Sequence, residues 1–340
     1  MNESHIFLEK NWQTALQTAI TDPQELFQLL DLDEKLLPAA YAAAKHFPLK
    51  VPRSLITRIQ KRNINDPILR QILPLGSETK EQEGYSKDPL QEKKFNVIPG
   101  LLHKYHGRLL LTLAGICGIN CRYCFRRDFP YAENNPGTTG WNKALEYIAN
   151  NPSITEVILS GGDPLIVNDH LLVELGQKLS KITHLKRLRI HSRMPIILPE
   201  RITPEFIHWC STSRFKMILV NHCNHSQELN ENVAHAMQSL VKAGVTVLNQ
   251  TVLLKGVNDN AQTLIELSEN LFAANILPYY LHMLDKVQGA AHFDVKQEVA
   301  QDLHWQITQQ LPGFLVPKLV CEYPGAPAKL SVEHLTLFTG

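Results

Sequence analysis

The sequence predicts an α/β protein in which a helical N-terminal region precedes a partial (β/α)6-type TIM barrel. Six short runs rich in Leu or β-branched residues alternate with helix-like segments, at an interval near about thirty residues after the first unit. Polar residues directly follow most of these runs. The chain has 340 residues, of which 44% are hydrophobic, so it can bury a large core.

The first part of the chain, to about residue 75, is predicted to be helical. Asp22, Pro23 and Glu25 supply an N-cap, a proline at the first helical position and an acid at the third, before an apolar run. Further helices are expected over 38–47 and 52–61. Apolar periodicity is lost from 76 to 94, which predicts an exposed connector. We therefore expect a helical region with its linker over 1–95.

The alternating part is expected to form the barrel over 96–316, followed by a C-terminal segment over 317–340. Buried parallel strands are predicted at 108–113, 156–159, 187–190, 216–220, 245–249 and 278–281. Helices are predicted at 141–149, 170–179, 204–210, 233–243 and 261–274.

Polar side chains stand where five of these strands end. Such residues also open ordinary loops, but the carboxyl ends of barrel strands build active sites, and five similar endings favour that interpretation. The residues are Ser160 to Asp163, His191 to Arg193, Asn221 with His222, Asn249 with Gln250, and His282.

Charge and composition narrow the class of protein. Lys plus Arg number 34 and Asp plus Glu 33, so no global field attracts nucleic acid or an anionic membrane. No signal peptide or membrane-spanning run is recognisable, and we expect a cytoplasmic protein. Three of the six cysteines lie within eight positions, which favours metal binding in a reducing compartment.

Those three residues, Cys117, Cys121 and Cys124, form a CxxxCxxC loop directly after the first predicted strand. Three thiolates bind three irons of a [4Fe-4S] cluster and leave the fourth iron open to a small molecule. The spacing is the signature of the radical S-adenosylmethionine superfamily. A structural zinc site is the competing interpretation, but it needs a fourth ligand that the sequence does not supply convincingly. An iron-sulfur electron carrier is a non-enzymatic alternative.

Gly161, Gly162 and Asp163 follow the second predicted strand. Two glycines allow a backbone to approach a ligand closely, although such a turn is also common in structural roles. The turn resembles the glycine-rich motif with which the superfamily contacts the methionine part of S-adenosylmethionine.

From about Pro99 to Leu330 the chain resembles the lysine 2,3-aminomutase family, and most closely its shorter branch that supplies β-lysine for modifying elongation factor P. The segments that carry the resemblance include GICGINCRYCFRR, ILSGGDPL, RLRIHSRMPIILPERI, PYYLHMLDKVQGAAHF and PGAPAK. The resemblance implies conversion of L-α-lysine to (R)-β-lysine by a 5'-deoxyadenosyl radical and pyridoxal phosphate. It also implies a reducing electron donor and a functional link to elongation factor P and its β-lysine ligase.

Residue roles follow from the same resemblance. Lys329 matches the lysine that carries pyridoxal phosphate, and Arg108 matches an arginine near that cofactor, with Lys104 a weaker candidate. Gln250, which ends a strand, is assigned to the cofactor site. Arg126 matches the family arginine that binds the substrate α-carboxylate, a task suited to a planar bidentate donor. Asp285 and Glu322 match the two family carboxylates that bind the distant ammonium group of the substrate.

The chain also departs from the longer family members. They carry Asp where this chain has Glu322. They also have a cysteine-rich, zinc-binding tail that is missing after Lys329, and a zinc cysteine where Asn260 stands. We therefore expect no zinc, and we do not transfer their oligomeric state. An aminomutase of another amino acid, such as glutamate, and a radical enzyme without pyridoxal phosphate remain alternatives; the paired carboxylates favour a cationic side chain.

Overall fold

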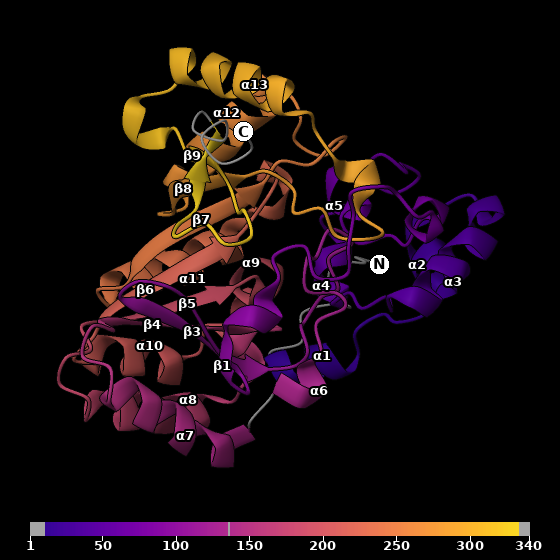
Figure 1. The fold of residues 1–340 in the computed structure, drawn as a ribbon. Coiled ribbons are helices and arrows are strands. Elements are labelled where there is room, and N and C mark those ends of the chain that lie inside the picture. Colours follow the sequence, from indigo (N-terminus) through magenta and orange to yellow (C-terminus); the bar gives the residue numbers. More distant parts are fainter. Residues whose placement is uncertain (1–10, 135–136, 333–340) are drawn as a thin grey trace.

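The computed structural model describes residues 11–134 and 137–332. Ten strands form one sheet whose spatial order is the order of the sequence (Figure 1). The strands are β1 (Asn96–Ile98), β2 (Leu101–Tyr105), β3 (Arg108–Ala114), β4 (Glu156–Gly161), β5 (Arg187–Ser192), β6 (Lys216–His222), β7 (Thr246–Val252), β8 (Leu277–His282), β9 (Lys318–Cys321) and β10 (Leu330–Ser331).

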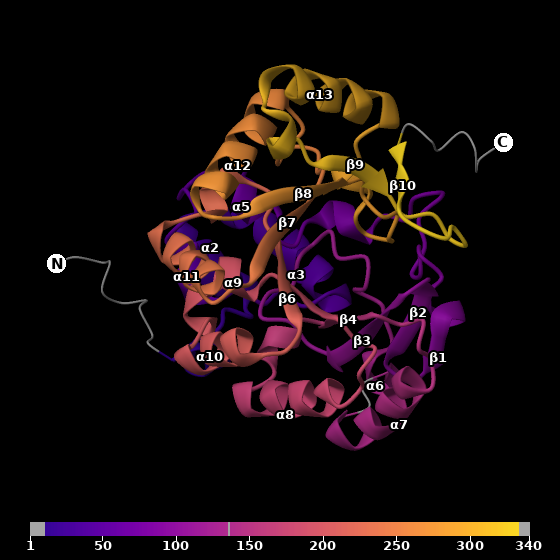
Figure 2. The ribbon, with the colours of Figure 1, turned by 90° about the vertical axis from the view of Figure 1, so that its left-hand side faces the viewer.

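Strands β3 to β8 are the six predicted parallel strands. Their ladders are parallel from β3 to β8, and a further parallel ladder joins β8 to β9. The sheet curves strongly (Figure 2), yet in the described part of the chain no ladder joins β1 to β10. The predicted partial barrel is therefore confirmed. The antiparallel hairpin β1–β2 and the short pair β9–β10 are additions that the sequence did not predict.

The helices that follow the strands cover the outside of the sheet (Figure 2). In α11, Asn230 accepts a hydrogen bond from the Val233 amide, and Val233, Met237 and Leu240 form one buried stripe. The five predicted outer helices are all present, and α13 was not predicted. Their bounds are α7 (Gly137–Ala149), α8 (Asp169–Ser180), α10 (Pro204–Thr212), α11 (Glu231–Lys242), α12 (Ala261–Ala273) and α13 (Gln297–Gln310).

The N-terminal region is a set of short helices beside the barrel. The predicted cap is confirmed, since the Asp22 side chain accepts from the Gln24 amide at the start of α2. The helix predicted over 52–61 is wrong in length: α4 ends at Ile56, and the buried Asp66 carboxylate binds the Gln60 amide instead. The short helices are α1 (Trp12–Gln17), α2 (Pro23–Leu30), α3 (Leu37–His46), α4 (Arg53–Ile56), α5 (Pro67–Arg70), α6 (Tyr131–Asn134) and α9 (Met194–Ile197).

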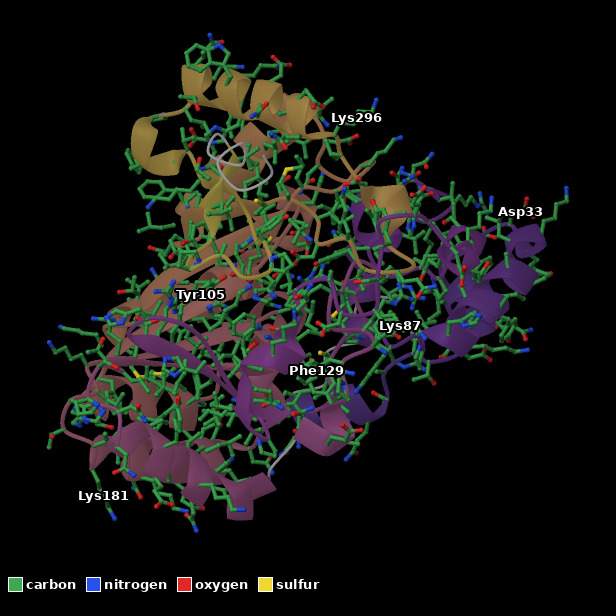
Figure 3. The ribbon with its side chains drawn as sticks, viewed as in Figure 1. Asp33, Lys87, Tyr105, Phe129, Lys181 and Lys296 are labelled. Carbon is green, nitrogen blue, oxygen red and sulfur yellow. The ribbon has the colours of Figure 1, made fainter. Side chains whose placement is uncertain are left out.

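The sequence predicts an exposed connector over 76–94, but the structure shows that this segment also contacts the barrel. The Glu78 side chain is buried and pairs with Arg122 and Arg127 of the cysteine loop. Ser86 forms a β-bridge with Val287, beyond β8. In Figure 3, Lys87 lies between the N-terminal helices and the strands. Long-range charge pairs, which local periodicity cannot show, tie this segment to the barrel.

A single large apolar cluster includes residues of the N-terminal helices, such as Leu26 and Ile68, and barrel residues such as Val157 and Leu188. This shared burial fixes the helices against the barrel. None of the helices in the described residues is long and apolar enough to cross a membrane.

Candidate active site

The cysteine loop follows β3 and carries Cys117, Cys121 and Cys124, all three partly buried. Burial, reinforced by the neighbouring thiols, raises the pKa of Cys117, and burial raises the pKa of Cys124 to about 12. The three thiols thus share one site in which a metal would hold them as thiolates. Within residues 11–134 and 137–332, no three His, Cys, Asp or Glu side chains converge on a single ion. Cluster ligands need no such convergence, because each binds a different iron.

The glycine turn after β4 lies directly against this loop. The Gly162 amide donates to the Ala114 carbonyl at 2.7 Å and the Asp163 amide to the Ile116 carbonyl at 2.9 Å. A Cβ on Gly162 would lie 2.2 Å from the Ile116 oxygen, and Gly161 has φ +117°. Only glycine fits this approach, so the turn and the loop form one unit.

The Asp163 side chain itself is fully engaged by the protein. Its oxygens accept from the Ser192 hydroxyl at 2.7 Å and from the amides of Leu165 at 2.9 Å and Arg193 at 2.8 Å. Asp163 therefore joins the turn to the end of β5.

Arg126 lies just after the cysteine loop, with its guanidinium held on two sides. Its Nε and Nη2 donate to the two carboxylate oxygens of Glu92 at 2.8 and 2.7 Å, and Nη1 donates to the Ser160 hydroxyl at 3.2 Å. The Arg126 and Glu92 side chains are 10% and 12% exposed. Arg126 is thus a buried, preorganised cation, and Glu92 of the connector is a carboxylate that already occupies its fork.

Glu322, which directly follows β9, binds two amines of the chain. The Lys329 ammonium donates to Glu322 Oε1, and Lys104 Nζ and the Tyr105 hydroxyl donate to Oε2 at 3.0 and 3.1 Å. Burial would raise the pKa of Glu322, but the two ammonium groups outweigh it and hold that pKa well below its usual range. Glu322 is therefore ionised and binds ammonium groups in this structure.

Asp285 lies beside Glu322 and behaves differently. Burial, with the Glu322 charge in second place, raises the pKa of Asp285 to about 7. The two carboxyl groups predicted to act together are therefore close enough to interact. One is permanently charged and the other is poised to ionise near neutral pH.

Arg108 begins β3, with its guanidinium carbon 4.8 Å from the centre of the Tyr105 ring. Lys329 Nζ lies 5.7 Å from the centre of the Tyr280 ring. In the described residues, Arg108 forms no ion pair with a carboxylate. The Lys329 amine can react with an aldehyde, the Tyr280 ring offers an aromatic face, and Arg108 can bind a phosphate. These groups fit pyridoxal phosphate, an aromatic aldehyde that carries a phosphate.

Between these groups, the strand ends supply buried polar side chains. Gln250 Nε2 lies 2.9 Å from His222 Nε2, and the Nε2 atoms of His191 and His282 are buried with no protein partner in the described chain. Burial lowers the pKa of His222 to about 3, with further contributions from Arg193, Arg126 and Lys329. These histidines are neutral donors or acceptors facing the interior.

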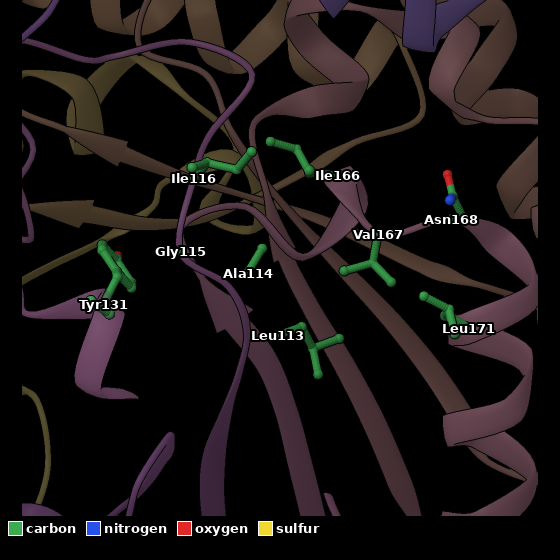
Figure 4. A pocket seen from close by; sticks show the side chains of 10 residues that line it. Leu113, Ala114, Gly115, Ile116, Tyr131, Ile166, Val167, Asn168 and Leu171 are labelled. Atoms are coloured by element: carbon green, nitrogen blue, oxygen red, sulfur yellow. The ribbon is translucent and has the colours of Figure 1, made fainter. Parts of the chain in front are cut away.

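Several of the predicted residues are near enough to interact electrostatically. Lys329 and Arg126 both lower the pKa of His222, and Glu92 helps to raise that of Asp285. A separate pocket of about 570 Å³ lies outside this group, between the start of the cysteine loop and α8 (Figure 4). Leu113, Ile116 and Leu171 are among its lining residues, and it contains none of the predicted site residues.

A buried partial barrel with an open three-cysteine loop after its first parallel strand defines a radical S-adenosylmethionine enzyme. Residues 106–191, which include the cysteine loop, match the family model described as a 4Fe-4S single cluster domain. A radical SAM methyltransferase from Sphaerobacter thermophilus aligns over 65% of this chain and 68% of its own, with 16% identity and a TM-score of 0.44.

Whole-chain relatives define the family. The chain is 51% identical to the L-lysine 2,3-aminomutase of Escherichia coli, over 95% of both chains, and 49% identical to that of Haemophilus influenzae, over 94% of this chain and 95% of the relative. The enzyme of the same name from Clostridium subterminale is 32% identical over 95% of this chain and 77% of its own. The chain belongs to the L-lysine 2,3-aminomutase family. It is accordingly an isomerase of the radical S-adenosylmethionine class with a [4Fe-4S] cluster.

Sequence reasoning missed two charged residues of the site, and it also missed Tyr105 and Tyr280 beside Glu322 and Lys329. Glu92 lay in the stretch interpreted as connector, and Arg193 was noted only as a strand ending. Only their position in the sequence could have indicated a role: Glu92 is an acid shortly before the first hairpin, and Arg193 is an arginine directly after a buried strand. Asn260, which stands where longer relatives were expected to carry a zinc ligand, instead caps α12 by accepting from the Thr263 amide.

Proposed function

We propose that this chain converts L-α-lysine to (R)-β-lysine. The observation that carries the proposal is Glu322, a buried carboxylate beside Asp285 that binds two amines of the chain, in a protein that also holds Arg126 as a buried cation. A substrate with a carboxylate at one end and an ammonium at the other fits this arrangement. Relatives that share about half of the sequence carry the name L-lysine 2,3-aminomutase.

The cluster is proposed to bind Cys117, Cys121 and Cys124, with Gly161 and Gly162 bringing the backbone close to S-adenosylmethionine. When bound, these groups supply a radical that removes hydrogen from substrate, and pyridoxal phosphate lets nitrogen move between neighbouring carbons. The chain's own contribution is to hold the glycine turn rigidly against the cysteine loop. Asp163, the third residue of this turn, belongs to the same proposed contact.

Arg126 is proposed to bind the substrate α-carboxylate. Its Nε and Nη2 are held by Glu92, and Nη1 lies beside the Ser160 hydroxyl at the end of β4. A guanidinium that is already oriented loses little freedom when a second carboxylate arrives. This placement sets one end of the substrate near the cysteine loop.

Glu322 and Asp285 are proposed to bind the ε-ammonium. The ion pair between Lys329 and Glu322 supports this proposal, because it shows that Glu322 accepts an ammonium group of the chain. If Lys329 carried pyridoxal phosphate, its amine would no longer be a free ammonium, and Oε1 of Glu322 would be open to the substrate while Lys104 and Tyr105 remain on Oε2. Arg108 and Gln250 are proposed to contact that cofactor. Two carboxylates disfavour glutamate, whose side chain is itself an anion.

The physiological role is proposed from the length of the relatives. The chain matches 95% of the Escherichia coli enzyme but 77% of the Clostridium subterminale enzyme, which fits the short form of the family. We propose that the product supplies a partner ligase that modifies elongation factor P, in the cytoplasm, and that the cluster receives its electron from a reducing electron donor. Residues 1–95, 96–316 and 317–340 are proposed as the helical region, the barrel and the segment with the cofactor lysine; residues 1–10, 135–136 and 333–340 of these spans lie outside the described residues.

The test is an anaerobic incubation of reconstituted protein with S-adenosylmethionine, pyridoxal phosphate, dithionite and L-lysine, followed by chiral chromatography with mass detection. (R)-β-lysine should form, and it should be lost in Lys329→Ala and Cys121→Ala. Lys296→Ala, at the N-cap of α13 outside the site, is the matched lysine control and should retain activity.

The products separate the possible failures. Formation of 5'-deoxyadenosine without β-lysine would refute the lysine assignment and leave the radical chemistry. Absence of the Lys329-dependent absorbance of bound pyridoxal phosphate would refute the role of Lys329. Addition of elongation factor P and its ligase then tests whether the product is attached.

A further inference from the structure

Arg193, at the end of β5, reaches the cysteine loop. Its Nη1 lies 2.8 Å from Cys121 Sγ and 2.9 Å from the Tyr123 hydroxyl. The Arg193 side chain is only 4% exposed, so water does not compete for these contacts. A buried N–H donor therefore points at the sulfur of a proposed cluster ligand.

The other arm of the guanidinium is anchored away from the loop. Arg193 Nη2 donates to Glu228 Oε2 at 2.8 Å and to Gln71 Oε1 at 2.7 Å. Glu228 is completely buried, and its second oxygen accepts from the Asn224 amide and from Gln71 Nε2. Because Glu228 neutralises the charge of Arg193, the influence at Cys121 is chiefly the local N–H to sulfur bond.

Gln71 directly follows α5, so this anchor comes from the N-terminal region. The same residue accepts the Arg122 amide through its carbonyl at 2.8 Å, and Lys50 accepts the Asn120 amide at 3.1 Å. The N-terminal helices thus form one wall of the cysteine loop. They hold both the loop and the arginine that contacts it.

We propose that Arg193 is a positioning residue that raises the reduction potential of the [4Fe-4S] cluster through its bond to Cys121, and that Gln71 holds it there. Reduction adds negative charge that spreads onto the ligand sulfurs, and a donor at one sulfur stabilises the reduced form more than the oxidised form. The inference rests on the proposed binding of the cluster by the three cysteines.

The test uses the full chain with its cluster reconstituted. Iron and sulfide content are measured first, and the midpoint potential is then determined by redox titration with electron paramagnetic resonance, without substrate. Arg193→Lys keeps the charge opposite Glu228, but its single nitrogen cannot serve both arms. We expect the reduced-to-oxidised ratio at a fixed potential to fall about tenfold, which is about 59 mV for one electron.

Two further variants complete the experiment. Gln71→Leu removes an anchor while leaving the Arg193–Glu228 pair, and it should shift the potential in the same direction by less. Arg201→Lys is the matched control: this arginine is equally buried and pairs with Asp169 at 2.7 Å, away from the cysteine loop. Its potential should equal that of the wild type.

Wild-type potentials in both Arg193→Lys and Gln71→Leu, at full iron content, would overturn the inference. A lower iron content with an unchanged potential in the loaded fraction would also overturn it, because Arg193 would then only support the loop. If Arg193→Lys does not fold, Gln71→Leu alone decides. A wild-type chain that binds no cluster would remove the proposed function as well.

Discussion

The affinity for lysine should depend on pH through Asp285. Its pKa is raised to about 7, first by burial and then by the Glu322 charge, while the pKa of Glu322 lies far below neutrality. An arriving ammonium binds the ionised carboxylate. Below the pKa, a proton must first leave Asp285, so affinity falls as pH falls and reaches a plateau above the pKa.

The magnitude follows from the ionised fraction. With a pKa of about 7, Asp285 is ionised to roughly one tenth at pH 6 and nine tenths at pH 8, so apparent affinity should change about tenfold between them. The ε-ammonium, with an ordinary pKa near about 10.4, stays charged throughout. Because the Lys329 charge lowers the pKa of Asp285, removing that charge by attaching the cofactor would move the midpoint upward and make the change between pH 6 and pH 8 larger than tenfold.

Calorimetric titration of the pyridoxal phosphate form with L-lysine, between pH 6 and 8.5, measures this dependence. Asp285→Asn should bind about 10 to 100-fold more weakly, because hydrogen bonds to charged groups contribute about 1.5–3 kcal/mol, and it should lose the pH dependence. Asp259→Asn, on a surface loop, is the control. A flat profile for the wild type, or an unaltered one for Asp285→Asn, would refute the reasoning.

Two further predictions concern the packing around the site. Gly162→Ala should abolish cluster loading, measured as iron per chain, because its Cβ would meet the Ile116 backbone oxygen at 2.2 Å. Gly313→Ala, whose Cβ would meet open space, should load normally, and equal loading of both variants would contradict this packing argument. Glu78→Gln should lower the free energy of unfolding by about 3–5 kcal/mol in urea titrations, because two buried guanidiniums lose their carboxylate. Glu25→Gln removes a partly exposed pair and should cost at most about 1 kcal/mol; equal losses would count against the burial argument.

Much of the fold could be read from local patterns. The six parallel strands have short apolar runs, and the helices between them have stripes such as Val233, Met237 and Leu240, so period and length were sufficient. Asp22 and Pro23 placed the start of α2. The hairpin β1–β2 escaped notice because its strands are short and its burial does not alternate clearly.

The cysteine loop was recognisable for a similar reason. Its three ligands lie within eight positions, and such spacing depends on the local backbone alone. Lys329, Asp285 and Glu322 carry no such local signature. They were found only through resemblance, and the structure then brought them around one carboxylate site.

The sequence by itself therefore determined the order of strands and helices, the cluster loop and the family. Only the tertiary structure decided which distant charges meet: Glu92 with Arg126, separated by 34 positions, and Gln71 with Arg193, separated by 122. The physical reason is range. Periodicity and capping act within a few residues, whereas a buried ion pair needs a particular partner at a particular distance, and that distance exists only after the barrel and the N-terminal helices have packed together.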